Sequence, residues 1–203
     1  MNNFNNINFS YSTLNIKFLI TNFSSQVQDI AFIGYSNVGK SSMINILLNK
    51  KIAYVSKTPG STLYINVFEN NKKKIRFLDF PGYGYNKFII KNKLKYFYIL
   101  QKYLNQKNSL KGIILLIDIR SLLKEKDIKI LKKLIFYKKP ILLILNKIDK
   151  ISKKNIKNNI NKIIEILKKK IDIFFDKKII LLTFSIINKK NLIKIKKIIN
   201  YWL

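Results

Sequence analysis

A run of eight residues has the types and order of a phosphate-binding loop. It has the form G-x-x-x-x-G-K-S and reads Gly34-Tyr35-Ser36-Asn37-Val38-Gly39-Lys40-Ser41. Its glycines let backbone N–H groups converge on a polyphosphate, the lysine reaches the β- and γ-phosphates, and the serine hydroxyl can bind Mg²⁺. An apolar run at 29–33 precedes the loop, and apolar residues with helical spacing follow from Ser42. The order strand, loop, helix favours a phosphate site over a chance turn.

The elements that must position this loop alternate along the chain. Apolar runs predict strands at 29–33, 63–68, 74–79, 112–117, 140–145 and 179–184, with a hairpin turn at 70–72. Segments 152–170 and 189–202 carry Ile and Leu on one stripe and lysines opposite, which favours helices packed on a sheet over membrane or RNA helices. We therefore predict one doubly wound α/β domain whose six-stranded sheet is mostly parallel, with one antiparallel edge strand.

Composition limits the chemistry that is available. The chain has 203 residues, 48% of them hydrophobic, which suits one domain with a substantial core. Cys and His are both absent, so disulfides, thiolate metal sites and imidazole bases are excluded. The N-terminus lacks the pattern of a secretory signal, and no apolar run approaches the roughly 18 residues of a membrane span. We expect a cytoplasmic protein with no membrane span.

The formal net charge of +30 has two explanations. Lysine-rich surfaces bind nucleic-acid phosphates, which would make the charge functional. Only Arg76 and Arg120 are arginines, however, and the lysines accompany heavy use of Ile and Asn. Those three amino acids have A/T-rich codons, so genome base composition is the alternative explanation, and the sequence leaves both open.

The element that would distinguish GTP from ATP is Asn146-Lys147-Ile148-Asp149. This element follows the apolar strand 140–145 and so lies at the carboxyl end of the sheet, where open α/β sheets bind ligands. The Asp149 carboxylate can accept hydrogen bonds from the N1–H and 2-amino groups of guanine, whereas adenine offers neither donor. Asn146 would hold the other edge of the base and brace the phosphate loop, with the Lys147 stem over the ring. The position after a buried strand favours guanine recognition over an ordinary surface turn.

Three further segments complete a GTPase site in the expected order. Asp79-Phe80-Pro81-Gly82 ends a strand, so that Asp79 can hold the hydration shell of Mg²⁺ and the Gly82 N–H can meet the γ-phosphate. Thr58-Pro59-Gly60-Ser61-Thr62 offers Thr62 as a second hydroxyl for Mg²⁺. Both segments would be released with the γ-phosphate and so act as switches. Phe184-Ser185-Ile186 follows the last strand and could offer a backbone N–H to guanine.

With these residues in place, the chain resembles the EngB family of bacterial GTPases, also called YihA or YsxC. The resemblance extends from about Ile16 to Trp202 and rests on the phosphate loop through Ser42, on Thr58-Pro59-Gly60 with Thr62, on Asp79-Phe80-Pro81-Gly82-Tyr83-Gly84-Tyr85, and on Asp118-Ile119-Arg120 with Asp127. It implies a three-layer P-loop NTPase fold of the Ras-like type, with 1–28 as a lead-in segment packed on the core and 29–203 as the G domain.

The resemblance also implies functions and partners. These are GTP and Mg²⁺ binding, a role in assembling the large ribosomal subunit through its rRNA or proteins, a historical link to cell division and septation, and a monomeric state. We assign catalysis to Lys40, Thr62, Gly82 and Asn37, and metal binding to Ser41, Thr62 and Asp79, the last through water. Nucleotide binding is assigned to the phosphate loop with Ser42, to Gly60, Ser61 and Thr62, to Asp79, Phe80, Pro81 and Gly82, to Asn146, Lys147 and Asp149, and to Phe184, Ser185 and Ile186.

The chain departs from the family pattern at two positions, and three other residues of the pattern have two possible roles. Ser61 stands where an arginine is usual, and Ile186 replaces a small residue. Asp118, Arg120 and Asp127 either brace the loop after the central strand or contact a partner.

Tyr83 occupies the position at which Ras-like enzymes place a water-orienting glutamine, so we expect slow intrinsic hydrolysis that depends on outside help. The help would come from a partner or from K⁺ held by Asn37, whose alternative role is an ordinary turn residue. Two other functions remain open: a nucleotide-gated RNA-binding scaffold with incidental hydrolysis, and an adenine-specific NTPase, against which the N-K-I-D element argues.

Overall fold

The structure of the protein is a computed structural model that describes residues 4, 6–15, 19, 27–55, 64–70, 72, 74–84, 98–105, 109–171 and 179–203. In chain order its elements are β1 (Asn8–Thr13), β2 (Gln28–Gly34), α2 (Lys40–Leu48), β3 (Ile65–Asn70), β4 (Ile75–Asp79), β5 (Leu110–Asp118), the 3₁₀ turn η1 (Ile119–Ser121), α4 (Glu125–Phe136), β6 (Ile141–Asn146), the 3₁₀ turn η2 (Ile148–Lys150), α5 (Lys153–Ile171), β7 (Ile179–Thr183) and α6 (Leu192–Trp202). Residues 98–104 are also helical. None of the described helices is both long enough and apolar enough to cross a membrane.

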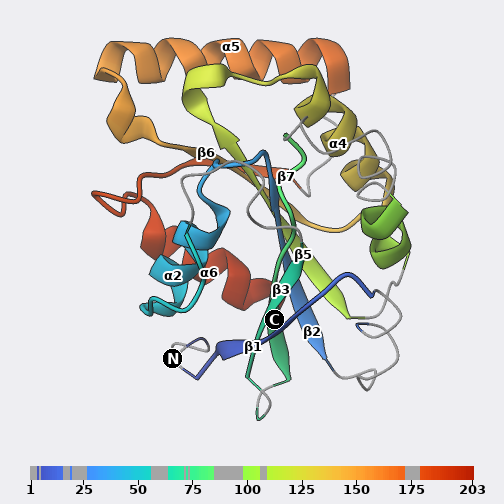
Figure 1. The fold of residues 1–203 in the computed structure, drawn as a ribbon. Coiled ribbons are helices and arrows are strands. Elements are labelled where there is room, and N and C mark those ends of the chain that lie inside the picture. The colour runs from blue at the N-terminus through green and yellow to red at the C-terminus, as the bar shows by residue number, and fades with distance from the viewer. Residues whose placement is uncertain are drawn as a thin grey trace.

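The described strands form one sheet in the order β1-β3-β4-β2-β5-β6-β7. Strand β3 runs antiparallel to β1 and β4, and every other neighbouring pair is parallel. The α/β class and the hairpin between β3 and β4 are therefore confirmed (Figure 1).

The sheet has seven described strands instead of the predicted six, so the antiparallel strand β3 is not at the edge. The additional strand β1 carries mainly polar, exposed residues, and it is held by contacts such as Ser12 Oγ to Asn66 Oδ1 at 2.7 Å. A strand that buries little apolar surface has no hydrophobic pattern in its sequence, because pairing and not burial stabilises it. Of the lead-in segment predicted at 1–28, the structure describes residues 4, 6–15, 19, 27 and 28.

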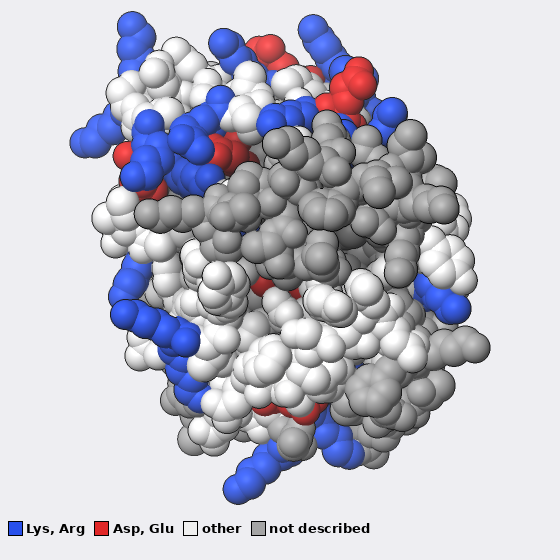
Figure 2. Space-filling model, viewed as in Figure 1, with Lys and Arg blue, Asp and Glu red and all other residues white. Residues whose placement is uncertain are grey.

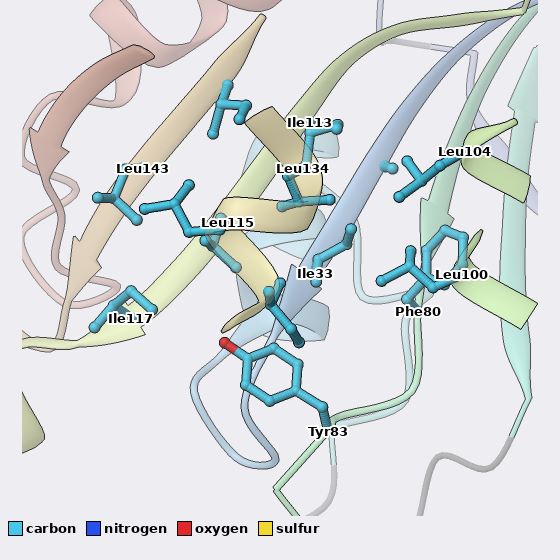
Figure 3. Close-up of a cluster of buried hydrophobic side chains, with 14 of the residues drawn as sticks. Ile33, Phe80, Tyr83, Leu100, Leu104, Ile113, Leu115, Ile117, Leu134 and Leu143 are labelled. Carbon is cyan, nitrogen blue, oxygen red and sulfur yellow. The ribbon is translucent and has the colours of Figure 1, made fainter. Parts of the chain in front are cut away.

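Two layers of helices cover the two faces of the sheet. Along β5, Ile113, Leu115 and Ile117 point into one buried cluster, while Ile114 and Leu116 point into the other. Residues 98–104 with α4 and α5 cover the first face, and α2 with α6 covers the second (Figures 1 and 3). Because successive side chains of a strand alternate between faces, strands buried on both sides must be apolar throughout. This explains the continuous apolar runs and confirms the three-layer arrangement.

A buried polar group ties strands β2 and β4 to the helix that covers them. Arg76 donates to both carboxylate oxygens of Asp29 at 2.7 and 2.8 Å, and the hydroxyl of Tyr103 donates to Asp29 at 2.7 Å. All three side chains are at most 2% exposed. Burial and the adjacent Asp29 carboxylate raise the pKa of Tyr103, which therefore remains a neutral hydrogen-bond donor. A buried charge persists only when it is paired in this way.

The topology places the phosphate loop at a switch point of the sheet. Strand β2 lies between β4 and β5. The strands that follow β2 in the chain, β3 and β4, lie on one side of it, and β5, β6 and β7 lie on the other, so the loop after β2 is at the point where the strand order reverses. The carboxyl ends of the parallel strands bring Gly34, Asp79, Asp118, Asn146 and Phe184 to one edge. Open α/β sheets bind ligands in the crevice at such an edge.

Candidate functional site

The phosphate loop has the backbone geometry that its glycines permit. Asn37 has φ 59° and Gly39 has φ 100°, both in the left-handed region that favours glycine and asparagine. A Cβ atom on Gly39 would lie 2.6 Å from the side-chain nitrogen of Asn146 and 3.3 Å from the Ile186 side chain. Gly39 is thus required both by its backbone angle and by the close approach of the base-recognition segments.

Lys40 begins helix α2 and lies over the phosphate loop. Its ammonium group is within 3.3 Å of the Tyr35 carbonyl and 3.5 Å of the Gly34 carbonyl, and the residue is 7% exposed. Burial lowers the pKa of Lys40, and the charge of Asp79 opposes that shift. A buried cation held by neutral carbonyls and facing a carboxylate is well placed to take a phosphate as its partner.

Ser41 and Asp79 provide a pair of oxygens suited to a magnesium ion. The Ser41 hydroxyl donates to one Asp79 oxygen at 2.7 Å. The other oxygen, Oδ1, is buried and has no hydrogen-bond partner among the described residues. Burial raises the pKa of Asp79, opposed by Lys40 and by the Ser41 hydrogen bond. Hard oxygen donors of this kind, one of them unpaired, fit Mg²⁺ or a water of its hydration shell.

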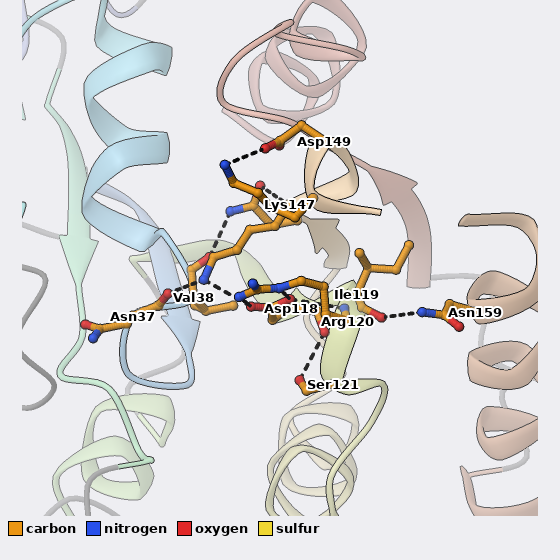
Figure 4. A network of polar contacts seen from close by, with 11 residues as sticks. Asn37, Val38, Asp118, Ile119, Arg120, Ser121, Lys147, Asp149 and Asn159 are labelled. Carbon is orange, nitrogen blue, oxygen red and sulfur yellow. Dashed lines mark hydrogen bonds and ion pairs between the residues drawn. The ribbon is translucent and has the colours of Figure 1, made fainter. Parts of the chain in front are cut away.

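The predicted base-recognition element, residues 146–149, is bonded directly to the phosphate loop. The Asn146 amide donates to the Val38 carbonyl at 2.8 Å, and its oxygen accepts from the Lys147 N–H at 2.8 Å. The Lys147 ammonium donates to the Asn37 carbonyl at 2.7 Å (Figure 4). Residues about one hundred positions apart in the chain thus form one polar unit, in which Asn146 braces the phosphate loop as predicted. Its contact with the base stays a prediction.

Asp149 is oriented by a residue of the loop after β7. The Ser185 hydroxyl donates to Asp149 Oδ1 at 2.7 Å, and Lys150 approaches Oδ2 at 3.6 Å. The Ser185 hydroxyl in turn accepts from the Ile187 N–H at 3.2 Å. The sequence indicated only a backbone contact at Ser185, so the structure adds a role for its side chain. A serine in a loop carries no local pattern that would indicate such a partner.

Asp118 joins two cationic side chains beside the phosphate loop. It pairs with Arg120 at 2.7 Å and with Lys147 at 3.0 Å, and it caps the 3₁₀ turn η1 through the Arg120 N–H (Figure 4). Burial alone would raise the pKa of Asp118, but the hydrogen bonds from Arg120 and Lys147 outweigh it and lower the pKa to about 2. Asp118 therefore braces Lys147, which itself braces Asn37.

Asp127 lines the same open cleft as Asp118 but makes separate contacts. The cleft has a volume of roughly 440 Å³ and borders the outer side of the phosphate loop. Asp127 accepts a 2.6 Å hydrogen bond from the hydroxyl of Tyr83. Tyr83 is 7% exposed and belongs to a buried cluster, so its side chain is directed into the core (Figure 3). The sequence indicated only what Tyr83 cannot do, and it missed this partner.

The other residues assigned to the nucleotide site differ in how far they are exposed. Phe80 is fully buried, with its ring 5.4 Å from that of Tyr103, so only its backbone is available to a nucleotide. Pro81 and Ser42 are partly exposed, and Phe184 is buried directly after β7. The predicted contacts of the segment Thr58–Thr62, with Gly60, Ser61 and Thr62, lie outside the described residues, as does Tyr85.

Comparisons with known proteins agree with this site. Residues 29–147 match the family described as "50S ribosome-binding GTPase". The chain is 40% identical over 176 residues to the "Probable GTP-binding protein EngB" of Blochmanniella pennsylvanica, covering 86% of each chain. It is 45% identical over 175 residues to the protein of the same description in Buchnera aphidicola subsp. Schizaphis graminum, covering 86% of this chain and 84% of that one.

Among solved structures, the chain is similar to a single-residue variant of Aquifex aeolicus Era bound to GDP.AlF4⁻. The TM-score is 0.66 with 27% sequence identity, over 88% of this chain and 57% of the Era chain. The resemblance to EngB proteins that the motifs indicated is therefore confirmed over most of the sequence. The phosphate-loop and N-K-I-D motifs agree with these relatives, which show that the chain belongs to the EngB family of GTP-binding proteins, within the P-loop GTPases.

Proposed function

We propose that this protein hydrolyses GTP slowly and acts as a nucleotide-dependent switch in assembly of the large ribosomal subunit. The observation that carries the proposal is the bonding between Asn146 and Val38 and between Lys147 and Asn37. These bonds make the base-recognition element and the phosphate loop one rigid receptor. A receptor of this kind reads both ends of a guanine nucleotide without reorganising, which favours tight binding.

Guanine is selected by the Asp149 carboxylate. The Ser185 hydroxyl donates to one of its oxygens, and the Asp149 side chain is 13% exposed. The carboxylate would accept further hydrogen bonds from the N1–H and 2-amino groups of guanine, whereas adenine offers neither donor. Phe184, Ser185 and Ile186 would contact the base from the other side, with Ile186 already against Gly39.

The phosphates and Mg²⁺ would occupy the opposite end of the receptor. Ser41 and Thr62 would bind the ion directly and Asp79 through water, while Lys40 and the Gly82 N–H would contact the phosphates. The ion supplies positive charge that neutralises the charge developing on the phosphate oxygens. The buried Oδ1 of Asp79, which has no hydrogen-bond partner in the described part of the chain, supports this assignment.

Slow hydrolysis follows from the position of Tyr83. Its hydroxyl donates to Asp127 in the core, so the side chain does not take the place of a water-orienting glutamine. We therefore propose stimulation from outside, by a partner surface or by K⁺ held at Asn37. The left-handed backbone of Asn37 also suits its alternative role as a turn residue.

The ribosomal partner is supported by the family description and by charge. Lys and Arg lie mostly around the margin of the face shown in Figure 2, and they are densest in the upper part, where α5 lies. Such a surface attracts RNA phosphates through counterion release.

We propose a monomeric protein that acts in the cytoplasm. The family link to septation would then be an indirect result of ribosome assembly.

Two measurements test the proposal. Titration with GDP and ADP, with and without Mg²⁺, should show preference for GDP, whereas tighter ADP binding would refute guanine selection and favour an adenine-specific NTPase. GTP turnover should rise on adding large-subunit particles, or on replacing Na⁺ with K⁺. No stimulation by either would refute the assisted-hydrolysis mechanism.

The net charge of +30 supports a second candidate function, a nucleotide-gated RNA-binding scaffold with incidental hydrolysis. The two functions differ in what they require of the protein. A scaffold would tolerate a variant that binds GTP without hydrolysing it but would fail when exposed lysines of α5 are replaced by glutamine. A switch would fail in the first case, because the particle would not be released.

A further inference from the structure

Tyr83 connects the turn after β4 to the start of helix α4. Its hydroxyl donates to Asp127 Oδ1 at 2.6 Å, and the two residues are 7% and 2% exposed. The other Asp127 oxygen accepts the Lys124 N–H at 2.8 Å, which fixes the carboxylate at the first turn of α4. A buried carboxylate with both oxygens bonded is a rigid acceptor, and losing one donor would leave it unsatisfied.

Tyr35 of the phosphate loop packs against the side chain of Tyr83. Its ring meets the Tyr83 ring edge-on, with centroids 5.7 Å apart and planes at 82°. The Lys124 ammonium lies 4.3 Å from the centroid of the Tyr35 ring. Edge-on aromatic pairs and cation–π contacts are both attractive. The phosphate loop, the turn after β4 and helix α4 therefore meet at Tyr83.

Gly82 lies between the bonded pair Tyr83–Asp127 and the phosphate loop, in close contact with the loop. The Ser36 hydroxyl donates to the Gly82 carbonyl at 3.3 Å, and a Cβ on Gly82 would lie 2.6 Å from the Ser36 Cα. A Cβ on Gly84 would overlap the Tyr35 ring. Phe80, two residues before Gly82, is fully buried in the core. Gly82 thus lies between two fixed points, the buried Phe80 side chain and the bonded Tyr83 side chain.

We propose that the hydrogen bond between Tyr83 and Asp127 anchors the Gly82 turn beside the phosphate loop, which makes Tyr83 a positioning residue that sets the preference for GTP over GDP. The inference rests on the proposed function, in which the Gly82 N–H meets the γ-phosphate. A preorganised N–H binds without a further loss of conformational entropy. GDP has no γ-phosphate, so its affinity does not depend on Gly82.

The test compares Tyr83→Phe with a matched variant, Tyr103→Phe. Each substitution removes one buried tyrosine hydroxyl from an aspartate, and Tyr103 lies on the helix of residues 98–104 and bonds to Asp29 at 2.7 Å. The dissociation constants for GDP and for a non-hydrolysable GTP analogue are measured with Mg²⁺, and the midpoint of thermal unfolding is measured for each variant. Both variants should unfold at lower temperature.

Only Tyr83→Phe should change nucleotide preference. We expect its affinity for the GTP analogue, relative to GDP, to fall about fivefold, the scale of one buried hydrogen bond. Asp127→Ala should give a similar fall, and the double variant should fall no further, because both residues act through one bond. An unchanged or increased preference in Tyr83→Phe, or an equal change in Tyr103→Phe, would overturn the inference while leaving GTP binding intact. If the unaltered protein binds guanine nucleotides no better than ADP, the proposed function fails as well.

Discussion

The side-chain amide of Asn146 donates a 2.8 Å hydrogen bond to the backbone carbonyl of Val38, so the end of β6 supports the phosphate loop. Replacing Asn146 with Ala should therefore weaken the binding of GDP and GTP together. Loss of one buried hydrogen bond predicts a fall of about tenfold in both affinities, measured by titration. Asn191→Ala is a matched control, because Asn191 donates to the Thr183 carbonyl at 2.9 Å. An effect on one nucleotide alone would contradict the bracing role.

The pairing of Asp149 with Ser185 predicts a change of base preference. Asp149→Asn turns one acceptor into a donor, which matches the 2-oxo group of xanthine better than the 2-amino group of guanine. We expect the free energy of GDP binding to become less favourable by about 1 to 3 kcal/mol, and xanthosine diphosphate to bind more tightly than GDP. Unchanged GDP affinity in competitive titrations would refute base recognition by Asp149. Ser185→Ala should weaken GDP binding without favouring xanthosine diphosphate.

The Ser41 hydroxyl and the Asp79 Oδ1 atom, which bonds to none of the described residues, predict a specific role for Mg²⁺. Chelation of Mg²⁺ should lower the affinity of the unaltered protein for GTP. Ser41→Ala should reduce that affinity in the presence of Mg²⁺ and leave little further loss on chelation, because the substitution removes a ligand of the ion. Ser42→Ala is the comparison, since Ser42 is assigned to nucleotide binding and not to the ion, so its effect should persist without Mg²⁺. Equal Mg²⁺ dependence in the two variants would contradict the ligand assignment.

Asp118 predicts a dependence of stability on pH. Its pKa is lowered from 3.8 to about 2, so its stabilising effect is full above the unfolded value and disappears as pH falls toward 2. Asp118→Asn should lower the free energy of unfolding by about 1 to 2 kcal/mol at pH 7, after allowance for the solvent around Arg120. Urea unfolding of nucleotide-free protein should show this difference shrinking below pH 4. Glu165→Gln, at an exposed position of α5, is the control, and a difference that does not vary with pH would disagree with the ion-pair explanation.

Much of the fold was predictable because long apolar runs and amphipathic helices are unambiguous. Strands β2, β5, β6 and β7 and helices α5 and α6 fall at or near the predicted positions. Strand β1 was not predicted, since a polar edge strand depends on its neighbour for hydrogen bonds and buries little. Its bonds, such as Ser12 to Asn66, exist only once β3 is in place.

The sequence alone indicated the EngB family, through the phosphate-loop and N-K-I-D motifs, because the residue types and spacing of such short motifs carry their chemistry. The tertiary structure decided which residues support those motifs. Ser185 beside Asp149 and Asp127 beside Tyr83 are 36 and 44 residues apart in the chain, and no spacing rule connects them. Such partners come together only when separate strands and helices pack, so their roles follow from the fold and not from local pattern.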